Sequence, residues 1–261
     1  MAFQQHHTLR SYTFDSLQFP EIVQGIFTRQ GGVSPAPWAS LNLGGTVGDS
    51  RDNVIENRRR VFEAIQRPVE TVFDSWQVHG DQVLITDRPR PLDEPHPKAD
   101  AILTNRPEVT LMMRFADCVP IFFYDPAHGV VGIAHAGWQG TVKKIAAAVV
   151  STMAATYGSQ PEAIIAGIGP SIGPEHYEIG EDVIAQVRQS FGADADGVLL
   201  NDNGRVQLDL WKANQWVLQQ AGVRQIEIAG LCTACHNQDW YSHRKEAGKT
   251  GRFAAVIALK S

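Results

Sequence analysis

The sequence predicts an α/β or α+β fold built around a large mixed β-sheet. Its 261 residues are 43% hydrophobic and 20% charged, which is close to the average of globular proteins. Short β-branched and aromatic runs are interleaved with stretches of helical period, but several strand signals follow one another directly between residues 71 and 134. Consecutive strands of this kind are typical of mixed sheets. With no repeat and no low-complexity linker, we expect a single domain over residues 1–261.

Each predicted element follows from its own local pattern. Strand signals lie at residues 21–28, 71–78, 82–86, 101–104, 109–115, 120–124, 130–134, 163–168, 225–229 and 253–259. Helical periodicity covers residues 52–65, 140–157, 181–191 and 209–221. Asp209 is a suitable N-cap for the last helix, and Gly158 is a suitable stop for the second. The proline-rich stretch at 88–97 is interpreted as a surface loop.

Composition and charge argue against several classes of protein. The formal net charge is −5 and no basic patch is visible, so nucleic acid is not an expected partner. No apolar run reaches the ~18 residues of a membrane span. The first ten residues lack the apolar segment of a signal peptide and cysteines are few, so we expect a cytoplasmic protein with free thiols. No sequence feature demands a partner chain, so we expect a monomer.

Three residues that can bind a transition metal come at predicted strand ends. His79 lies in QVHG, Cys118 in ADCVP and His135 in HAGWQGT. Taken one at a time, they also fit a loop histidine, a small core residue and a residue next to a tight turn. Together, two imidazoles and a thiolate are good zinc ligands, and three protein ligands leave a fourth position open, as in catalytic sites. Their spacing permits convergence without requiring it.

Other polar residues have a weaker local signal. Pro120 cannot donate a ladder hydrogen bond, so the Asp117–Cys118 step is predicted to be a bend at a sheet end. Arg29 lies in a glycine-containing loop that could bind phosphate or a carboxylate, although the loop lacks the lysine of a P-loop. Arg58 on a helix and Arg244 near the C-terminus fit a solvated surface equally well.

Cys232 and Cys235 form a Cys-x-x-Cys-His pattern, which is the attachment signature of c-type haem. Haem attachment normally requires export, and a zinc ribbon requires a second Cys-x-x-Cys pair. A thioredoxin-like pair would begin a helix, and the residues that follow do not resemble a helix start. The sequence therefore favours a loop with free thiols after a core strand, and it leaves the role of these two cysteines open.

A series of motifs resembles the YfiH family, in this order along the chain: TRQGGVS, LNLGG, ENRR, QVHG, ADCVP, HAGWQGT, GIGPSIG, YEIG, LDL, CTAC and TGRFA. This family is also called the polyphenol oxidase, laccase-domain or peptidoglycan editing factor family. The resemblance runs from about residue 27 to residue 257, and HAGWQGT with ADCVP is its most specific part. It implies a layered sandwich of mixed β-sheets flanked by helices. It also implies a zinc site made by His79, Cys118 and His135.

The resemblance further implies phosphorolysis of purine nucleosides (adenosine, inosine and methylthioadenosine) to the free base and ribose 1-phosphate. Adenosine deamination is implied at the same site, so a purine nucleoside and phosphate are the expected partners. The older laccase label implies copper and phenol oxidation. Oxygen reduction by laccases needs several coppers, and hence many more histidine ligands than a chain with nine histidines offers, so zinc is the expected metal.

For this chemistry we expect further residues around the metal. Asp117 is predicted to orient a ligand or to take a proton. Arginines are candidates for phosphate, amides for the sugar or base, and an indole for stacking on the purine. These substrate-binding candidates are Arg29, Asn42, Arg58, Gln77, Trp138 and Arg244. Many family members carry an aromatic pair and two arginines after the CT motif, where this chain has His243 and Lys245 beside Arg244, and this departure weakens the assignment of Arg244.

Three alternatives stay open at this point. Cys118 could be the nucleophile of a cysteine hydrolase or amidase, with His135 as base and Asp117 as the group that orients it. The family's association with peptidoglycan precursor editing suggests an accessory role in removing wrongly built intermediates. A copper polyphenol oxidase is the third alternative. The sequence leaves open the preferred nucleoside and the relative rates of phosphorolysis and deamination.

Overall fold

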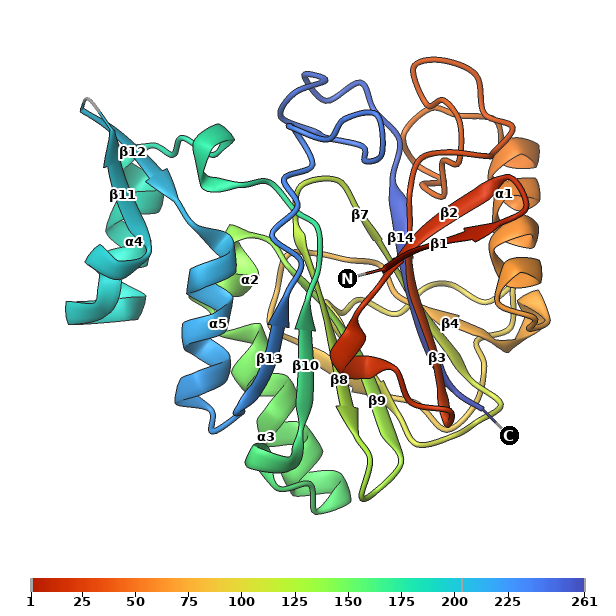
Figure 1. Cartoon of the computed structure of the whole chain (residues 1–261), viewed down its shortest axis with the longest axis horizontal. Coiled ribbons are helices and arrows are strands. Elements are labelled where there is room, and N and C mark those ends of the chain that lie inside the picture. The colour runs from red at the N-terminus through yellow and green to blue at the C-terminus, as the bar shows by residue number, and fades with distance from the viewer. Residues whose placement is uncertain (1, 203, 261) are drawn as a thin grey trace.

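Two mixed β-sheets lie face to face at the centre of the computed structural model, which describes residues 2–202 and 204–260 (Figure 1). In the described ranges, the first sheet has six strands in the order β1 (Ala2–His6), β2 (Leu9–Thr13), β3 (Ile22–Phe27), β14 (Phe253–Leu259), β7 (Thr110–Phe115) and β4 (Val72–Asp74). The second, counted over the same residues, has six in the order β13 (Gln225–Ile228), β10 (Ile165–Ile168), β8 (Val119–Asp125), β9 (Val130–Ala136), β6 (Ala101–Thr104) and β5 (Val83–Ile85).

Each sheet combines antiparallel pairs with parallel pairing at one or both of its edges. The parallel pairs are β4 with β7 in the first sheet, and β5 with β6 and β10 with β13 at the two edges of the second. A separate antiparallel hairpin joins β11 (Leu199–Asp202) to β12 (Arg205–Leu208). The mixed-sheet prediction is therefore confirmed, with one parallel edge in the first sheet and two in the second.

Helices cover the outer faces of both sheets (Figure 1). On one side lies α1 (Arg51–Ala64). On the other side lie α2 (Trp138–Val142), α3 (Ile145–Tyr157), α4 (Glu181–Phe191) and α5 (Leu210–Gln220). Short 3-10 turns complete the chain: η1 (Asp15–Leu17), η2 (Val69–Thr71), η3 (Pro161–Ala163), η4 (Pro174–His176) and η5 (Gly192–Gly197). The predicted sandwich of sheets flanked by helices is confirmed.

Three apolar cores separate these layers. The middle core lies between the sheets and contains Phe115 and Phe253 from the first sheet and Phe122 and Ile133 from the second. A second core fills the space between the second sheet and its helices, and a third lies under α1. Since β8 and β9 are buried on both faces, they have apolar residues at almost every position instead of alternating ones.

The structure corrects two boundary predictions and adds strands that the sequence did not predict. The helix expected over residues 140–157 is two helices, because Lys144 adopts a left-handed backbone with φ of 62° and starts a new direction. The strand expected over 71–78 ends at Asp74, where a loop begins. The strands β1 and β2 and the hairpin β11–β12 were not predicted, because their mostly polar sequences carry no apolar strand pattern. Asp209 does cap α5, accepting the backbone N–H of Lys212 at 3.0 Å.

The β8–β9 hairpin places two of the predicted metal ligands next to each other. Its register pairs Val119 with Ala136 and Pro120 with His135. Cys118 directly precedes β8, so its sulfur comes next to the His135 end of β9. Among the described residues, every helix is too short or too polar to cross a membrane.

Candidate metal centre and anion-binding cavity

Three side chains from separate loops and strands converge at one end of the sheets. One ligand atom each of His79, Cys118 and His135 lies within 4.8 Å of the other two. The ring centroids of the two histidines are 4.9 Å apart, with the rings close to perpendicular. The convergence that the sequence only permitted is therefore present in the fold.

Local backbone strain accompanies this cluster. His79 has a φ of 58° and Asp117, next to Cys118, has a φ of 81°. Positive φ is uncommon outside glycine and costs of order 1–3 kcal/mol, so it persists where surrounding contacts enforce it. Both residues lie in the short connections that follow β4 and β7. The strained residues are therefore a candidate metal ligand, His79, and the neighbour of another, Cys118.

Asp100 orients the cluster, although no pattern in the sequence predicted this role. Its Oδ1 lies 2.9 Å from Nδ1 of His135, so Nε2 of this imidazole is left to face the cluster. The same carboxylate accepts the backbone N–H groups of Val78, His79 and Gly80 at 2.7–3.1 Å. One buried carboxylate therefore fixes two of the three ligands, one through its ring and the other through its loop.

Gly137 closes the cluster from the helix side. A Cβ built on this residue would lie 2.8 Å from Sγ of Cys118 and 3.2 Å from the His79 ring. Any side chain here would push into the space between the ligands. The glycine of HAGW is therefore required by close approach and not by an unusual backbone, since its φ is −71°.

The charges in the cluster favour the thiolate. Burial alone raises the pKa of the Cys118 thiol, but the charge of His135 and hydrogen bonds from His135 and His79 lower it to about 6. Burial also lowers the pKa of His135, while the Cys118 sulfur and the Asp100 carboxylate raise it to about 9. A thiolate is the form of cysteine that binds metals, and the proton on His135 would have to leave when a cation binds.

The donor set fits a single zinc ion. Two imidazoles and one thiolate are borderline-soft ligands, and three of them leave a fourth position open. Among the described residues, His176 is the one other histidine found in a group that could bind a metal, so the histidine-rich multicopper centre of a laccase has no counterpart in those residues.

Two cavities meet at this cluster. The larger, of about 1080 Å³, contains the three candidate ligands in its wall, and the smaller, of about 300 Å³, contains His79 and Cys118. Asp117 and Tyr177 line both. The wall of the larger cavity is strongly cationic and includes Arg51, Arg58, Arg59, Arg90, Arg114, Arg244 and Arg252.

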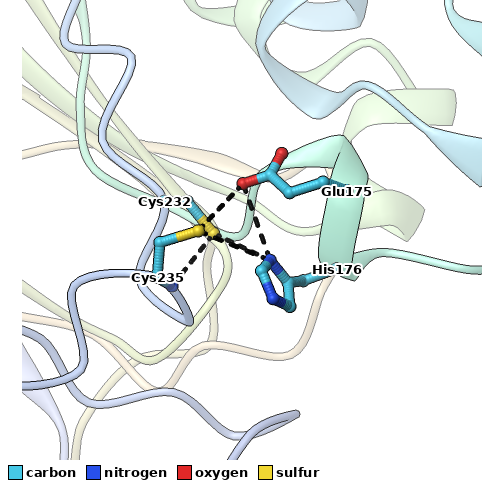
Figure 2. Close-up of side chains that lie close together, drawn as sticks. All are labelled: Glu175, His176, Cys232 and Cys235. Atoms are coloured by element: carbon cyan, nitrogen blue, oxygen red, sulfur yellow. Dashed lines mark hydrogen bonds and ion pairs between the residues drawn. The ribbon is translucent and has the colours of Figure 1, made fainter.

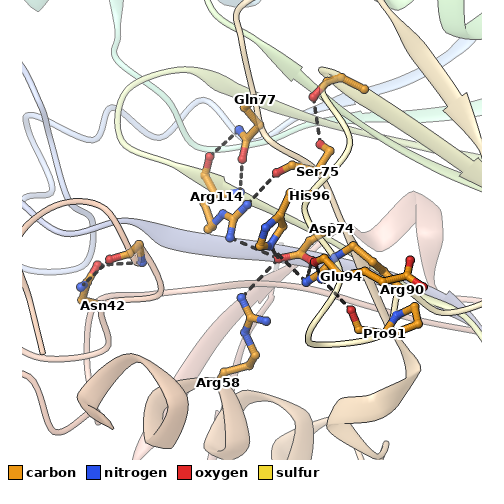
Figure 3. A network of polar contacts seen from close by, with 12 residues as sticks. Asn42, Arg58, Asp74, Ser75, Gln77, Arg90, Pro91, Glu94, His96 and Arg114 are labelled. Carbon is orange, nitrogen blue, oxygen red and sulfur yellow. Dashed lines mark hydrogen bonds and ion pairs between the residues drawn. The ribbon is translucent and has the colours of Figure 1, made fainter. Parts of the chain in front are cut away.

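A buried carboxylate organises part of this cationic wall (Figure 3). Asp74, at the end of β4, bonds to Arg90 at 2.7 Å and to Arg58 and Arg114 at 3.2 Å each. His96 lies 3.1 Å from the same carboxylate. Burial opposes ionisation of Asp74, but the His96 hydrogen bond and the two nearby guanidinium groups hold its pKa well below the usual range. One negative charge among three arginines leaves a surplus of positive charge facing the cavity.

Four of the predicted substrate-binding residues line these cavities. Arg58, Gln77 and Arg244 line the larger one, and Trp138 lines the smaller one. The Gln77 amide is already paired with the backbone of Arg114, donating to its carbonyl at 2.7 Å and accepting its N–H at 3.0 Å. Gln77 therefore positions Arg114 instead of presenting a free amide.

The other two predicted substrate-binding residues lie outside the linings of these cavities. Arg29 is absent from the lining of both cavities; it bonds to Glu246 at 3.0 Å and lies over the Tyr241 ring. Asn42 is buried, bonding to Asp49 and Gly44 and accepting the N–H of Arg252. The polar atoms of both side chains are therefore occupied by hydrogen bonds within the protein.

Asp117 bonds to Thr233 and Arg244 and not to His135, the partner expected in the cysteine hydrolase alternative. Its carboxylate accepts a hydrogen bond from the Thr233 hydroxyl at 2.6 Å and from the Arg244 backbone N–H at 2.7 Å. The group that orients His135 is Asp100, so the role that the cysteine hydrolase alternative gave to Asp117 falls to another residue.

The sequence missed Asp74, Arg90, Arg114 and Asp100. Asp100 directly precedes β6 and resembles any polar residue at a strand start. Arg90 lies in the proline-rich stretch, where a surface loop was predicted, yet its side chain is almost fully buried. An arginine among prolines, whose buried acidic partner lies 16 positions earlier in another element, gives no periodic signal. Of the three arginines bonded to Asp74, only Arg58 was among the predicted phosphate candidates.

Known proteins resemble this chain over nearly all of its length. The family described as multi-copper polyphenol oxidoreductase laccase matches residues 23–260. A Deinococcus radiodurans protein named purine nucleoside phosphorylase is 42% identical over 232 residues, covering 89% of this chain and 87% of its own. Purine nucleoside phosphorylase YlmD of Bacillus subtilis is 38% identical over 250 residues, covering 92% and 89%.

Solved structures agree with the sequence relatives. The crystal structure of hypothetical protein YfiH from Bacillus licheniformis superposes with a TM-score of 0.92 at 35% identity and covers 99% of both chains. YlmD from Geobacillus stearothermophilus gives the same TM-score, identity and coverage. With the family match spanning most of the sequence and the fold shared end to end, the chain belongs to the multi-copper polyphenol oxidoreductase laccase family, which includes the YfiH and YlmD proteins.

Proposed function

We propose that this protein is a zinc-dependent purine nucleoside phosphorylase that acts on adenosine, inosine and methylthioadenosine. The observation that carries the proposal is the junction of a two-histidine, one-cysteine cluster with a cationic cavity. Phosphorolysis needs a place for the phosphate anion, and a bound cation could stabilise the negative charge of the phosphate or of the departing base. The relatives named purine nucleoside phosphorylase support the same reaction for this chain.

His79, Cys118 and His135 would bind the zinc ion. When bound, zinc supplies a Lewis acid with one open coordination position. Asp100 keeps the His135 ring in the tautomer that presents Nε2, and the Gly137 backbone leaves room between the ligands.

Arg58 and Arg114 are the residues that we assign to the phosphate. Both lie in the wall of the larger cavity, and both are aligned by the Asp74 carboxylate. A guanidinium offers several N–H donors in one plane, which matches the oxygens of a phosphate. Asp74 prevents the arginines from repelling one another, while the net charge of the group still attracts an anion.

The purine then lies on the other side of the cluster, in the smaller cavity beside Trp138. An indole offers a flat apolar face for a base. In the reaction, a phosphate oxygen forms a bond to the anomeric carbon of the ribose and the bond from that carbon to the base nitrogen breaks. The base leaves with the bonding electron pair and takes up a proton, which gives free base and ribose 1-phosphate. Deamination of adenosine by water at the same cluster is the second activity that we propose.

The test uses two histidines that share a left-handed backbone, His79 in the cluster and His7 in an N-terminal loop. His79→Asn should abolish base release from inosine and phosphate and lower the zinc content, whereas His7→Asn should leave both unchanged. Asparagine tolerates positive φ, so neither substitution adds backbone strain. Unchanged turnover in His79→Asn would refute the proposal.

Chelation separates the phosphorylase from the rival functions. The zinc enzyme loses base release on removal of the metal and regains it with zinc. A cysteine hydrolase keeps its activity without metal and loses it on alkylation of Cys118. A copper oxidase regains activity with copper only. Ammonia release from adenosine, measured without phosphate, reports the deaminase activity separately.

A further inference from the structure

A second group of potential metal ligands lies outside the cluster described above (Figure 2). It consists of Glu175 and His176 from η4 and of Cys232 and Cys235 from the loop after β13. One ligand atom from each lies within 4.8 Å of the other three. Nδ1 of His176 is 3.7 Å from the Cys232 sulfur and 3.6 Å from the Cys235 sulfur, and the Glu175 carboxylate is 3.3 Å from the latter.

The backbone around these residues is arranged for a thiolate. The sulfur of Cys232 accepts backbone N–H groups from Gly173 at 3.2 Å and from Cys235 at 3.4 Å. The His236 N–H bonds to the Cys232 carbonyl at 2.9 Å and closes the turn, so both sulfurs project to one side. N–H groups aimed at a sulfur stabilise its negative charge and are the kind of outer contact that supports metal ligands.

The two ligand pairs come from segments that are already joined. A β-bridge pairs Ser171 with Cys232, and backbone hydrogen bonds link Ser171 to Leu231 and Thr233. The bridge places η4 opposite the Cys-x-x-Cys turn. A zinc ribbon would need a second Cys-x-x-Cys pair, and in this fold the Glu175–His176 pair takes its place.

We propose that Glu175, His176, Cys232 and Cys235 bind a structural zinc ion, distinct from the ion at His79, Cys118 and His135. Two thiolates, one imidazole and one carboxylate form a complete tetrahedral set, so this site has no open position. These ligands carry three negative charges, and a divalent cation would reduce the total to −1. Lys245, whose ammonium bonds to the Ala234 carbonyl at 2.8 Å, supplies positive charge beside the loop.

The second ion would fix one wall of the reaction cavities. Tyr177, which lines both cavities, directly follows the ligand His176. Thr233, between the two cysteines, donates to Asp117 beside Cys118. Arg244 donates to the Glu178 carbonyl at 3.0 Å and so connects the same segment to the larger cavity. Binding of a metal here therefore couples the position of this wall to metal content.

Metal analysis in a Cys118→Ser background isolates the second site, because that substitution removes a ligand from the first. We expect this variant, purified under reducing conditions, to retain about one zinc ion per chain. Adding Cys235→Ser or His176→Asn should remove that ion. Glu175→Gln should also remove the ion. The matched controls are Glu178→Gln and His236→Asn, which change a carboxylate and a histidine just outside the group. Both control variants should retain the zinc ion.

Cobalt substitution gives an independent readout. Cobalt in the Cys118→Ser protein should show sulfur-to-metal charge transfer and the visible bands of tetrahedral coordination, and His176→Asn should lose both. Because the His176 side chain is exposed, this variant keeps the test decisive if the double cysteine variant fails to fold. These results do not depend on whether the site at His79, Cys118 and His135 binds zinc or supports phosphorolysis. The two proposals are therefore tested separately.

Two results would overturn the proposal. One is a Cys118→Ser protein that is folded and reduced but binds no metal at stoichiometric zinc. The other is a Cys232–Cys235 disulfide in freshly isolated protein, detected by thiol counting and mass spectrometry. The first would leave these residues as surface polar groups, and the second would make them a redox pair.

Discussion

Asp100 and His135 are joined by a hydrogen bond of 2.9 Å between Oδ1 and Nδ1, and this buried contact determines which imidazole nitrogen faces the metal cluster. Asp100→Asn keeps an oxygen for the backbone N–H groups but removes the charge. We expect it to lower zinc affinity by roughly 10–100-fold, the usual cost of removing an outer-shell partner. Competition with a chromogenic chelator measures this change. Affinity equal to that of the wild type would show that the contact does not orient the ring.

Gly137→Ala tests the close approach at the cluster. The added Cβ would lie 2.8 Å from the Cys118 sulfur, so a ligand must move. We expect loss of bound zinc together with destabilisation of ~1–3 kcal/mol, as for overpacking of a core. Gly197→Ala is the control, because a Cβ there has no neighbour within 4 Å. Metal content of the purified proteins and urea denaturation provide the two measurements. Equal zinc content in both variants would contradict the geometry.

Arg58→Gln tests the phosphate assignment. Loss of a charged hydrogen bond costs ~1.5–3 kcal/mol, so we expect the KM for phosphate to rise by roughly 10–100-fold. The KM for inosine should change much less. Arg60, on the same helix but outside the cavity lining, is the matched control, since it pairs with Glu56. Steady-state kinetics with phosphate varied at saturating inosine measure this change. A rise in the inosine KM alone would contradict the assignment of Arg58 to the phosphate.

Asp74→Asn tests the role of the buried carboxylate in stability. Removing the charge leaves Arg90 buried without its partner, and we expect a loss of ~3–5 kcal/mol at pH 7, against little change for the exposed Asp93→Asn. The native pKa of Asp74 is depressed, so its stabilisation is complete above its ordinary value of 3.8 and is lost as pH falls below it.

The difference in unfolding free energy between wild type and Asp74→Asn should therefore shrink below pH 3.8, by about 1.4 kcal/mol per pH unit. Guanidinium chloride denaturation at pH 7, 4 and 3 measures it. A difference that grows on acidification would reverse the sign and exclude an ionised Asp74 in the native state.

The sequence allowed prediction of the elements with strong periodicity and of the three residues that converge in the candidate metal cluster. The α4 helix and the strands β6 and β14 have the bounds expected from apolar pattern and flanking glycine. His79, Cys118 and His135 were found because their residue types are chemically distinctive and each ends a strand signal.

What could not be predicted depends on pairing between distant residues. The side chain of Arg29 is turned from the cavity by Glu246, which is 217 positions away. A glycine-rich loop indicates a close approach but not which way a guanidinium in it points. The Asp100–His135 pair spans 35 positions for the same reason. The monomeric state and the cytoplasmic location stay predictions, for gel filtration and cell fractionation to test.

If the cluster binds zinc as proposed, the pairing of Pro120 with His135 ties metal uptake to the register of the β8–β9 hairpin. Side chains alternate between faces along a strand, so a slip of one position in this hairpin would turn the imidazole to the opposite side. A chain misassembled in this way could retain much of its apolar interior and yet fail to acquire zinc. Metallation of newly made protein would then report the fraction of molecules whose hairpin closed correctly.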